Sequence, residues 1–172
     1  KDHAEASNLA ARLSSWVEPV LARLMPGVRR TPEASAPVSM NLAANMLGLD
    51  NAATPLGLKA MERLQQGNPQ PTRATDSQIM FLVLNTSSVT LVPVTVLLFR
   101  AQQGASDPAA VYLPLLMATT VSTLVGILVT ARVQRISLRD PLLLVVAGIW
   151  LALLAGLGAL VWLAPTELAN TL

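Results

Sequence analysis

The sequence predicts an all-α integral membrane protein, and three observations support this fold class. Hydrophobic residues make up 52% of the 172 residues and charged residues only 13%, whereas a soluble domain carries about 25% charged residues. The charge is also unevenly distributed, because residues 77–172 hold only four of the Lys and Arg residues and three of the Asp and Glu residues. That second part contains three uncharged stretches of at least 23 residues each, enough to cross a bilayer as helices.

The rest of the composition limits the kinds of catalytic and metal-binding site that we expect. There is no Cys, and the one His is His3, so thiolate metal sites, disulfides and His-based catalytic triads are not expected. No nucleophile stands beside a base, and no Gly-rich phosphate loop is present. We therefore expect no catalytic residues, no metal and no cofactor. A formal net charge of +2 is too small to indicate a nucleic-acid partner.

Residues 1–30 are expected to form an amphipathic region on the cytoplasmic membrane surface. Apolar residues recur there at steps of three and four, and arginines flank them, as in helices that lie in a membrane interface. Pro19 is expected to start a second short helix or to kink the first. The alternative is an amphipathic helix that packs on its own protein. The apolar stripe comprises Leu9, Leu13, Trp16, Val17, Val20, Leu21 and Leu24, and the arginines are Arg12, Arg23, Arg29 and Arg30.

Residues 37–66 are expected to form a re-entrant helical hairpin. The uncharged run Ala34–Leu49 has 16 residues, which is short for a membrane span. Basic residues lie on both sides of it, at Arg29–Arg30 and at Lys59–Arg63. If both sides face the cytoplasm, the chain between them enters the membrane and returns.

Residues that typically start and end helices predict the two arms of this hairpin. Pro37 suits the first turn of a helix over 37–47, and Gly48 suits its C-terminal cap. Thr54 suits the N-cap of a second helix over 55–66, with Pro55 at its first position. The expected tip covers residues 48–53.

Three transmembrane helices are expected over residues 77–99, 108–131 and 141–166. The first contains Asn85-Thr86-Ser87-Ser88 near its middle and then Pro93. Since Pro93 removes a backbone donor, this helix is expected to be broken. The loop 132–140 contains three arginines and the loop 100–107 only one, which places the first loop in the cytoplasm and the second outside.

Polar residues inside the apolar segments predict a small binding site. Broken helices whose ends meet near the membrane midplane are typical of secondary-transporter sites, and amides and hydroxyls suit a neutral solute or a weakly held cation. An ionisable residue at that depth is a further indication. The alternative is that these side chains only join helices or cap turns. The candidate substrate-binding residues are Asn41, Asn45, Asp50, Asn51, Thr54, Asn85, Thr86 and Ser87.

Small residues recur every four positions in the last two spans, which is typical of close helix packing. The packing is expected within the chain or with a second subunit, so that a homo-oligomer is one alternative. The helix-packing residues are Ala118, Ser122, Gly126, Gly148, Ala152 and Gly156.

Two segments carry a resemblance to a known family. These are SMNLAANMLGLDNAATPLGLKAMERLQ, at Ser39–Gln65, and FLVLNTSSVTLVPVTV, at Phe81–Val96. The chain resembles the spore maturation protein A family over roughly residues 9–131. That family lies within the wider group of nucleoside recognition or Gate-domain proteins of the bacterial inner membrane. Asn45, Asn51, Thr54, Asn85, Thr86 and Ser87 fall in the matching motifs.

The resemblance implies a multi-pass inner-membrane protein related to parts of concentrative nucleoside transporters and of ferrous iron transporter B. It implies a nucleoside-like solute, a role in spore core dehydration, and a spore maturation protein B-like subunit or fused second half as partner. It divides the chain into an interfacial region at 1–30, a Gate-like domain at 31–131, and an additional helix at 141–166 that is expected to lead into a second half.

Three departures from the family pattern qualify this assignment. A hydrophobic segment that usually precedes the amphipathic region is missing, so truncation at that end is expected. The span at 141–166 goes beyond the typical end of the family. Asp50 stands where Gly is expected, so a role for its charge does not carry over.

Three functions compete on the sequence alone. The first is transport or gating of a small polar solute or ion. The second is a membrane assembly module that binds a partner without transporting anything. The third, an intramembrane enzyme, has the least support, because Asp50 would be its only available base.

Overall fold

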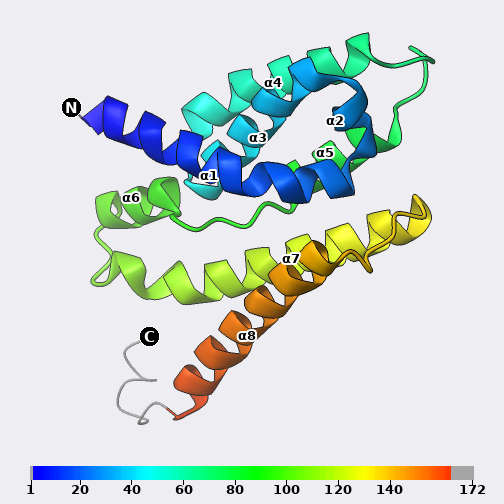
Figure 1. The fold of residues 1–172 in the computed structure, drawn as a ribbon. Helices are drawn as coiled ribbons and strands as arrows, with labels where there is room; N and C mark the ends of the chain where they lie inside the picture. The colour runs from blue at the N-terminus through cyan, green and yellow to red at the C-terminus, as the bar shows by residue number, and fades with distance from the viewer. Residues whose placement is uncertain (1, 164–172) are drawn as a thin grey trace.

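A computed structural model describes the backbone of residues 2–163 and the side chains of residues 11–49 and 51–159. Within this part of the chain every regular element is a helix (Figure 1). The last residues of the expected span 141–166 and the expected outer segment 167–172 lie outside the described residues. The elements are α1 (Asp2–Leu24), α2 (Pro26–Arg30), α3 (Pro32–Met46), α4 (Asp50–Gln66), α5 (Asp76–Thr86), α6 (Val94–Gln102), η1 (Pro108–Val111), α7 (Tyr112–Val133) and α8 (Pro141–Leu163).

Helix α1 packs along α3, as one of the two alternatives for the amphipathic region requires. Leu21 and Leu24 on its apolar stripe are buried, whereas Trp16 is 77% exposed. Pro19 does not start a second helix, because α1 continues through it to Leu24. The next helix begins instead at Pro26, where a missing N–H costs nothing. A position on the membrane surface stays a prediction.

Helices α3 and α4 form a closely packed hairpin, but its arms are longer than expected. Pro32 takes the first helical position of α3, so Pro37 lies inside that helix. Pro55 likewise lies inside α4, which begins at Asp50, so the prediction of Thr54 as an N-cap was wrong. The turn is shortened to Leu47–Leu49, and Gly48 adopts a φ of 64° there. That left-handed conformation suits Gly.

The expected first span is interrupted, as the sequence predicted. Thr75 caps α5 by accepting a hydrogen bond from the backbone N–H of Gln78, and the Gln78 side chain accepts one from the Thr75 N–H in return. The helix then ends at Thr86, and a non-helical segment of seven residues, Ser87–Pro93, leads to α6. At 1.5 Å per residue, the 11 residues of α5 extend roughly 17 Å, about half of the hydrocarbon core.

The last two expected spans are long apolar helices. Pro108–Val133 and Pro141–Ala159 are long and apolar enough to cross a membrane. Of the 18 most apolar consecutive residues in each helix, only 11% and 6% are buried inside the structure. The core helix of a soluble protein is mostly buried. Their outward apolar faces therefore indicate a membrane protein. The passage of α5 and α6 through the membrane stays a prediction.

Most of the hydrophobic core lies among α1 to α5, and Ala131 of α7 and Leu143 of α8 also belong to it. Met25, Val38 and Met80 are fully buried there, and Leu42 and Phe81 are nearly so. Helix α8 diverges from the rest of the bundle (Figure 1). The core fixes the hairpin against α5, and this packing sets the geometry of the region described next.

Candidate functional site at the hairpin tip and the broken helix

The turn of the α3–α4 hairpin lies beside the non-helical connection between α5 and α6, hereafter the break segment, Ser87–Pro93 (Figure 1). The backbone carbonyl of Met46, at the end of α3, accepts hydrogen bonds from the N–H groups of Leu91 at 2.7 Å and Val92 at 3.3 Å. A carbonyl at a helix C-terminus has no partner within its own helix. The N–H groups of the break segment donate to this carbonyl. The hairpin end and the break segment therefore satisfy each other's backbone hydrogen-bonding groups.

Gly48 allows the two backbones to approach this closely. A Cβ atom at Gly48 would lie 2.3 Å from the carbonyl oxygen of Val92 and 3.1 Å from the backbone N of Val94. No real Cβ atom fits at such a distance. Gly48 is therefore required twice, by its φ of 64° and by the contact with the break segment.

Two asparagines join the hairpin to α5. The Asn45 side chain donates from Nδ2 to Oδ1 of Asn85 at 2.8 Å. Asn85 Nδ2 in turn donates to the backbone carbonyl of Phe81 at 2.8 Å. Both asparagines are half-buried, so these two hydrogen-bonded side chains lie between the hydrophobic core and the accessible surface of the break segment.

Helix α7 supplies hydroxyl groups to the other side of the break segment. Thr123 Oγ1 donates to the carbonyl of Ser87, and Thr119 Oγ1 accepts from the N–H of Thr90 at 3.4 Å. Tyr112 donates its phenolic hydroxyl to the carbonyl of Leu91 at 3.0 Å. Sequence reasoning assigned none of these three residues to the site. The i, i+4 spacing of Thr119 and Thr123 in an otherwise apolar helix was the available signal.

The other predicted site residues do not all reach the break segment. Asn41 is 2% exposed and donates from Nδ2 to the carbonyl of Ala53 at 2.7 Å, so it joins the two arms of the hairpin. Its Oδ1 is buried without a hydrogen-bond partner among the described residues. Asn51 and Thr54 are exposed on the first turns of α4, and Asp50 is the first residue of that helix.

Thr86 and Ser87 bond mainly within their own helix. The hydroxyl of Thr86 donates to the carbonyls of Leu82 and Val83, and that of Ser87 to Val83 at 2.7 Å. Such bonds return to carbonyls of the preceding turn, and Val83 also accepts the backbone N–H of Ser87 at 3.0 Å. Ser87 reaches α7 through its backbone carbonyl, whereas Thr86 stays exposed.

Of the small residues expected at helix contacts, Gly126 meets another described helix closely. A Cβ there would lie 3.0 Å from Val83 Cγ1 and 3.3 Å from Ser87 Oγ, so Gly126 brings α7 next to the start of the break segment. Gly148 and Gly156 have no neighbouring atom within 4 Å of such a Cβ. Ala118, Ser122 and Ala152 are exposed.

The described side chains of the site are neutral, and the side chain of Asp50 lies outside the described residues. The described side chains that hydrogen-bond to the break segment or to Asn45 are an amide, aliphatic hydroxyls and a phenol. Such groups bind by donating and accepting hydrogen bonds, and they offer no fixed charge. The arrangement suits a polar solute without net charge or a cation held by oxygen atoms.

The family model described as nucleoside recognition, Gate, matches residues 3–102, more than half of the chain. The chain belongs to the Gate family. This match includes the hairpin and the break segment and ends at the last residue of α6. The hydroxyl-bearing face of α7 therefore lies beyond the Gate match.

Spore maturation protein A of Bacillus subtilis (strain 168) is 37% identical to this Gate protein over 126 residues. The aligned region covers 73% of this chain and 64% of the relative. The resemblance to spore maturation protein A seen in the sequence is thereby confirmed. No solved structure matches the chain.

Proposed function

We propose that this Gate protein transports or gates a small polar solute or ion across the bacterial inner membrane. The hairpin tip and the break segment form the passage, and alternating access moves the solute without a catalytic step. The observation that carries the proposal is the contact between the hairpin end and the break segment. The Met46 carbonyl accepts from the break segment, and the adjacent Asn45–Asn85 bond joins α3 to α5. In a membrane, non-helical backbone is tolerated where protein or water surrounds it, and transporter sites are built from discontinuous helices of this kind.

The chemistry of the site and the family name support the class of solute. Amides and hydroxyls hydrogen-bond a neutral heterocycle or sugar, and the family description refers to nucleoside recognition. We propose a nucleoside-like solute, bound by Asn45 and Asn85 together with the hydroxyls from α7. Asn51 and Thr54 on the exposed start of α4 contact it at the mouth of the passage.

The topology consistent with this function has α7 and α8 crossing the membrane and the hairpin entering and leaving on the cytoplasmic side. Because the chain lacks Cys, single cysteines can be placed without background. Ser137→Cys in the α7–α8 loop should react with an impermeant maleimide only from the cytoplasmic side. Ser106→Cys, beyond α6, should react from outside. Both serines are exposed, and labelling of both from one side would overturn the topology.

Transport is tested with the full-length protein in liposomes. Flux of labelled nucleosides and of cations is measured for wild type, Asn45→Ala, Asn85→Ala and the control Thr72→Ala, which replaces an exposed loop residue. We expect flux for wild type and the control, and loss for the two asparagine variants. Absence of flux for every solute in a folded wild-type protein would contradict transport.

Solute protection locates the site independently. Asn51→Cys should react with a maleimide, and a transported nucleoside should slow that reaction. The same nucleoside should leave the labelling of Ser137→Cys unchanged. Equal labelling rates with and without solute would remove Asn51 from the site.

The name of the Bacillus relative refers to spore maturation, and we propose that this chain acts in that process.

A second candidate function is a membrane assembly module, in which a spore maturation protein B-like subunit or second copy packs on α8. The open faces at Gly148 and Gly156 favour it. Gly148→Leu should then abolish co-purification of that partner while α8 still forms, whereas transport through the hairpin predicts no change in flux.

A further inference from the structure

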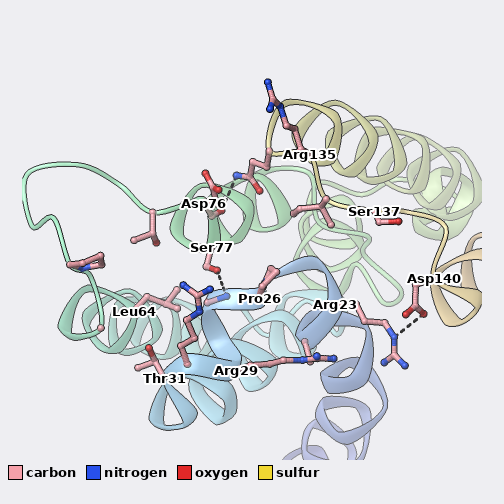
Figure 2. Close-up of a pocket in the computed structure, with 18 of the residues that line it drawn as sticks. Arg23, Pro26, Arg29, Thr31, Leu64, Asp76, Ser77, Arg135, Ser137 and Asp140 are labelled. Carbon is pink, nitrogen blue, oxygen red and sulfur yellow. Dashed lines mark hydrogen bonds and ion pairs between the residues drawn. The ribbon is translucent and has the colours of Figure 1, made fainter.

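A basic pocket, distinct from the hairpin tip, lies where four chain segments meet. These are the end of α1, the short helix α2, the connection from α4 to α5, and the loop between α7 and α8 (Figures 1 and 2). The pocket has a volume of about 850 Å³, within the range of small-ligand sites. It lies beyond the C-terminus of α7 and before the start of α8, so it opens where these apolar helices end.

The pocket concentrates positive charge. Its lining contains five arginines, Arg23, Arg29, Arg30, Arg135 and Arg139, and two acids, Asp76 and Asp140. The formal charge of +3 exceeds that of the whole chain, which is +2. Arg residues present planar arrays of donors that match the oxygen atoms of phosphate.

One of the five arginines is neutralised by a carboxylate. Arg23 Nε lies 2.8 Å from Asp140 Oδ1, and Figure 2 shows this pair at one side of the pocket. The other four arginines form no ion pair with the described acidic residues. Four like charges in one pocket repel one another, so an anion that bridges them would lower the energy of this end of the molecule.

The pocket walls are fixed by hydrogen bonds. Ser77 Oγ, at the start of α5, accepts from the backbone N–H of Gly27 at 3.0 Å and so holds α2 against α5. Gln134 Nε2 donates to the carbonyl of Asp76 at 2.9 Å and holds the α7–α8 loop against the same helix. Both bonds are drawn in Figure 2. Arginines carried on fixed segments bind an anion at a lower entropy cost than arginines on mobile loops.

Arg135 occupies a backbone conformation that disfavours its side chain. Its φ is 56°, in the left-handed region, and the N–H of Ile136 closes the end of α7 by donating to the carbonyl of Ala131 at 2.8 Å. Gly is the usual residue at this type of helix end. An arginine therefore stands here at a conformational cost, at a position that lines the pocket, although Figure 2 shows its side chain directed away from the other labelled residues.

We propose that this pocket binds the phosphate group of an anionic ligand. An anionic phospholipid headgroup is the favoured source, because the pocket opens at the ends of α7 and α8, the depth at which headgroups lie. A basic loop that only orients the chain in the membrane requires neither a shared cavity nor a strained arginine. A free phosphate or nucleotide is the other source of the same chemistry.

Binding is measured by native mass spectrometry of the full chain in mild detergent, with added phosphatidylglycerol, phosphatidylcholine, inorganic phosphate or adenosine monophosphate. The wild type should retain phosphatidylglycerol and release phosphatidylcholine. Arg29→Gln/Arg139→Gln removes two charges from two of the segments that line the pocket, α2 and the α7–α8 loop, and should weaken retention by about tenfold or more. Asp76→Asn removes a carboxylate from the lining and should strengthen it.

The matched control is Arg73→Gln/Arg132→Gln. Both residues are exposed, outside the pocket lining, and close in sequence to it, so this variant removes the same charge without touching the site. Retention by the control should match wild type. Equal weakening in both double variants, with unchanged helix content, would overturn the proposal, as would a folded wild type that retains none of the four probes.

The soluble probes distinguish the two sources of phosphate. Displacement of phosphatidylglycerol only by other anionic lipids identifies the headgroup. Saturable binding of inorganic phosphate or adenosine monophosphate that is lost in Arg29→Gln/Arg139→Gln identifies a free phosphate ligand at the same pocket. Transport through the hairpin does not enter either readout.

Discussion

Asn45 Nδ2 on α3 donates a hydrogen bond of 2.8 Å to Asn85 Oδ1 on α5, two residues before the break segment begins at Ser87. This bond joins residues that are 40 positions apart in the sequence. It lies beside the carbonyl of Met46, which receives the N–H groups of the break segment. The hairpin end is therefore hydrogen-bonded both to α5 and to the break segment.

Removal of either asparagine should destabilise the fold modestly and in a coupled manner. We expect Asn45→Ala and Asn85→Ala each to lower the free energy of unfolding, with a coupling energy of about 0.5–1.5 kcal/mol in a double-mutant cycle. Unfolding in detergent is followed by circular dichroism. Strictly additive losses would mean that the 2.8 Å bond does not stabilise the protein in solution.

Gly48→Ala should destabilise the protein more than Gly104→Ala. Both glycines have a positive φ, 64° and 75°, so each Ala costs about 1–2 kcal/mol of backbone strain. A Cβ at Gly48 also meets the Val92 carbonyl oxygen at 2.3 Å, whereas one at Gly104 meets nothing within 4 Å. The melting temperatures of the two variants are compared, and equal values would contradict close contact at the tip.

Gly57→Ala should disturb the two arms of the hairpin through Asn41. A Cβ at Gly57 would lie 2.9 Å from Asn41 Nδ2, which is held by its bond to the Ala53 carbonyl. We expect a loss of about 1 kcal/mol or more as that bond breaks. The loss should be absent when Asn41→Ala is already present. Gly148→Ala, inside α8 and with a Cβ that meets open space, is the control and should stabilise the protein by about 0.5–1 kcal/mol, since glycine weakens a helix interior.

Arg135→Gly should stabilise the protein, by about 1 kcal/mol, because glycine adopts a φ of 56° without strain. Arg132→Gly, three residues earlier in the last turn of α7, should instead destabilise it by up to about 1 kcal/mol, since glycine has a low helix propensity. Both variants lose one positive charge. Opposite shifts in the melting temperatures of the two variants confirm the conformational explanation. Shifts in the same direction would mean that the lost charge causes the change in stability.

The Arg23–Asp140 pair should make stability depend on pH only in the acid range. Partial desolvation raises the pKa of Asp140, but the hydrogen bond and charge of Arg23 and the N–H groups of Leu142 and Leu143 outweigh it, so that the pKa lies below its ordinary value of 3.8. A carboxyl with a lowered pKa stabilises the folded state above its unfolded pKa and loses that contribution as pH falls through the folded pKa.

Asp140→Asn should therefore lower the melting temperature at pH 7 and approach the wild-type value as the pH falls below about 3.8. The effect is small, because each side chain of the pair is about one-third exposed. Asp140→Ala should cost more at every pH, since it also removes the acceptor of the Leu142 N–H at 2.9 Å. Identical pH profiles for wild type and Asp140→Asn would contradict the ion pair's contribution.

Several features of the molecule followed from local sequence. Long uncharged runs predicted α7 and α8, and the polar tetrad with Pro93 predicted the break in the first span. Gly48 marked the end of α3, although Pro37 and Pro55 did not mark the starts of α3 and α4. A proline marks a helix start only when no earlier residue can take the first helical position. In α3, Pro32 already takes that position.

The sequence by itself determined the class of the molecule, because hydrophobicity and helix punctuation depend on residues that are neighbours in the chain. Only the tertiary structure decided which polar groups meet. It paired Asn45 with Asn85, added hydroxyls from α7, left Thr86 and Asn51 exposed, and gathered arginines from separate segments into one pocket. Such contacts depend on how the core packs α3 against α5 and where α7 ends, and no local pattern specifies the distance between segments far apart in the sequence.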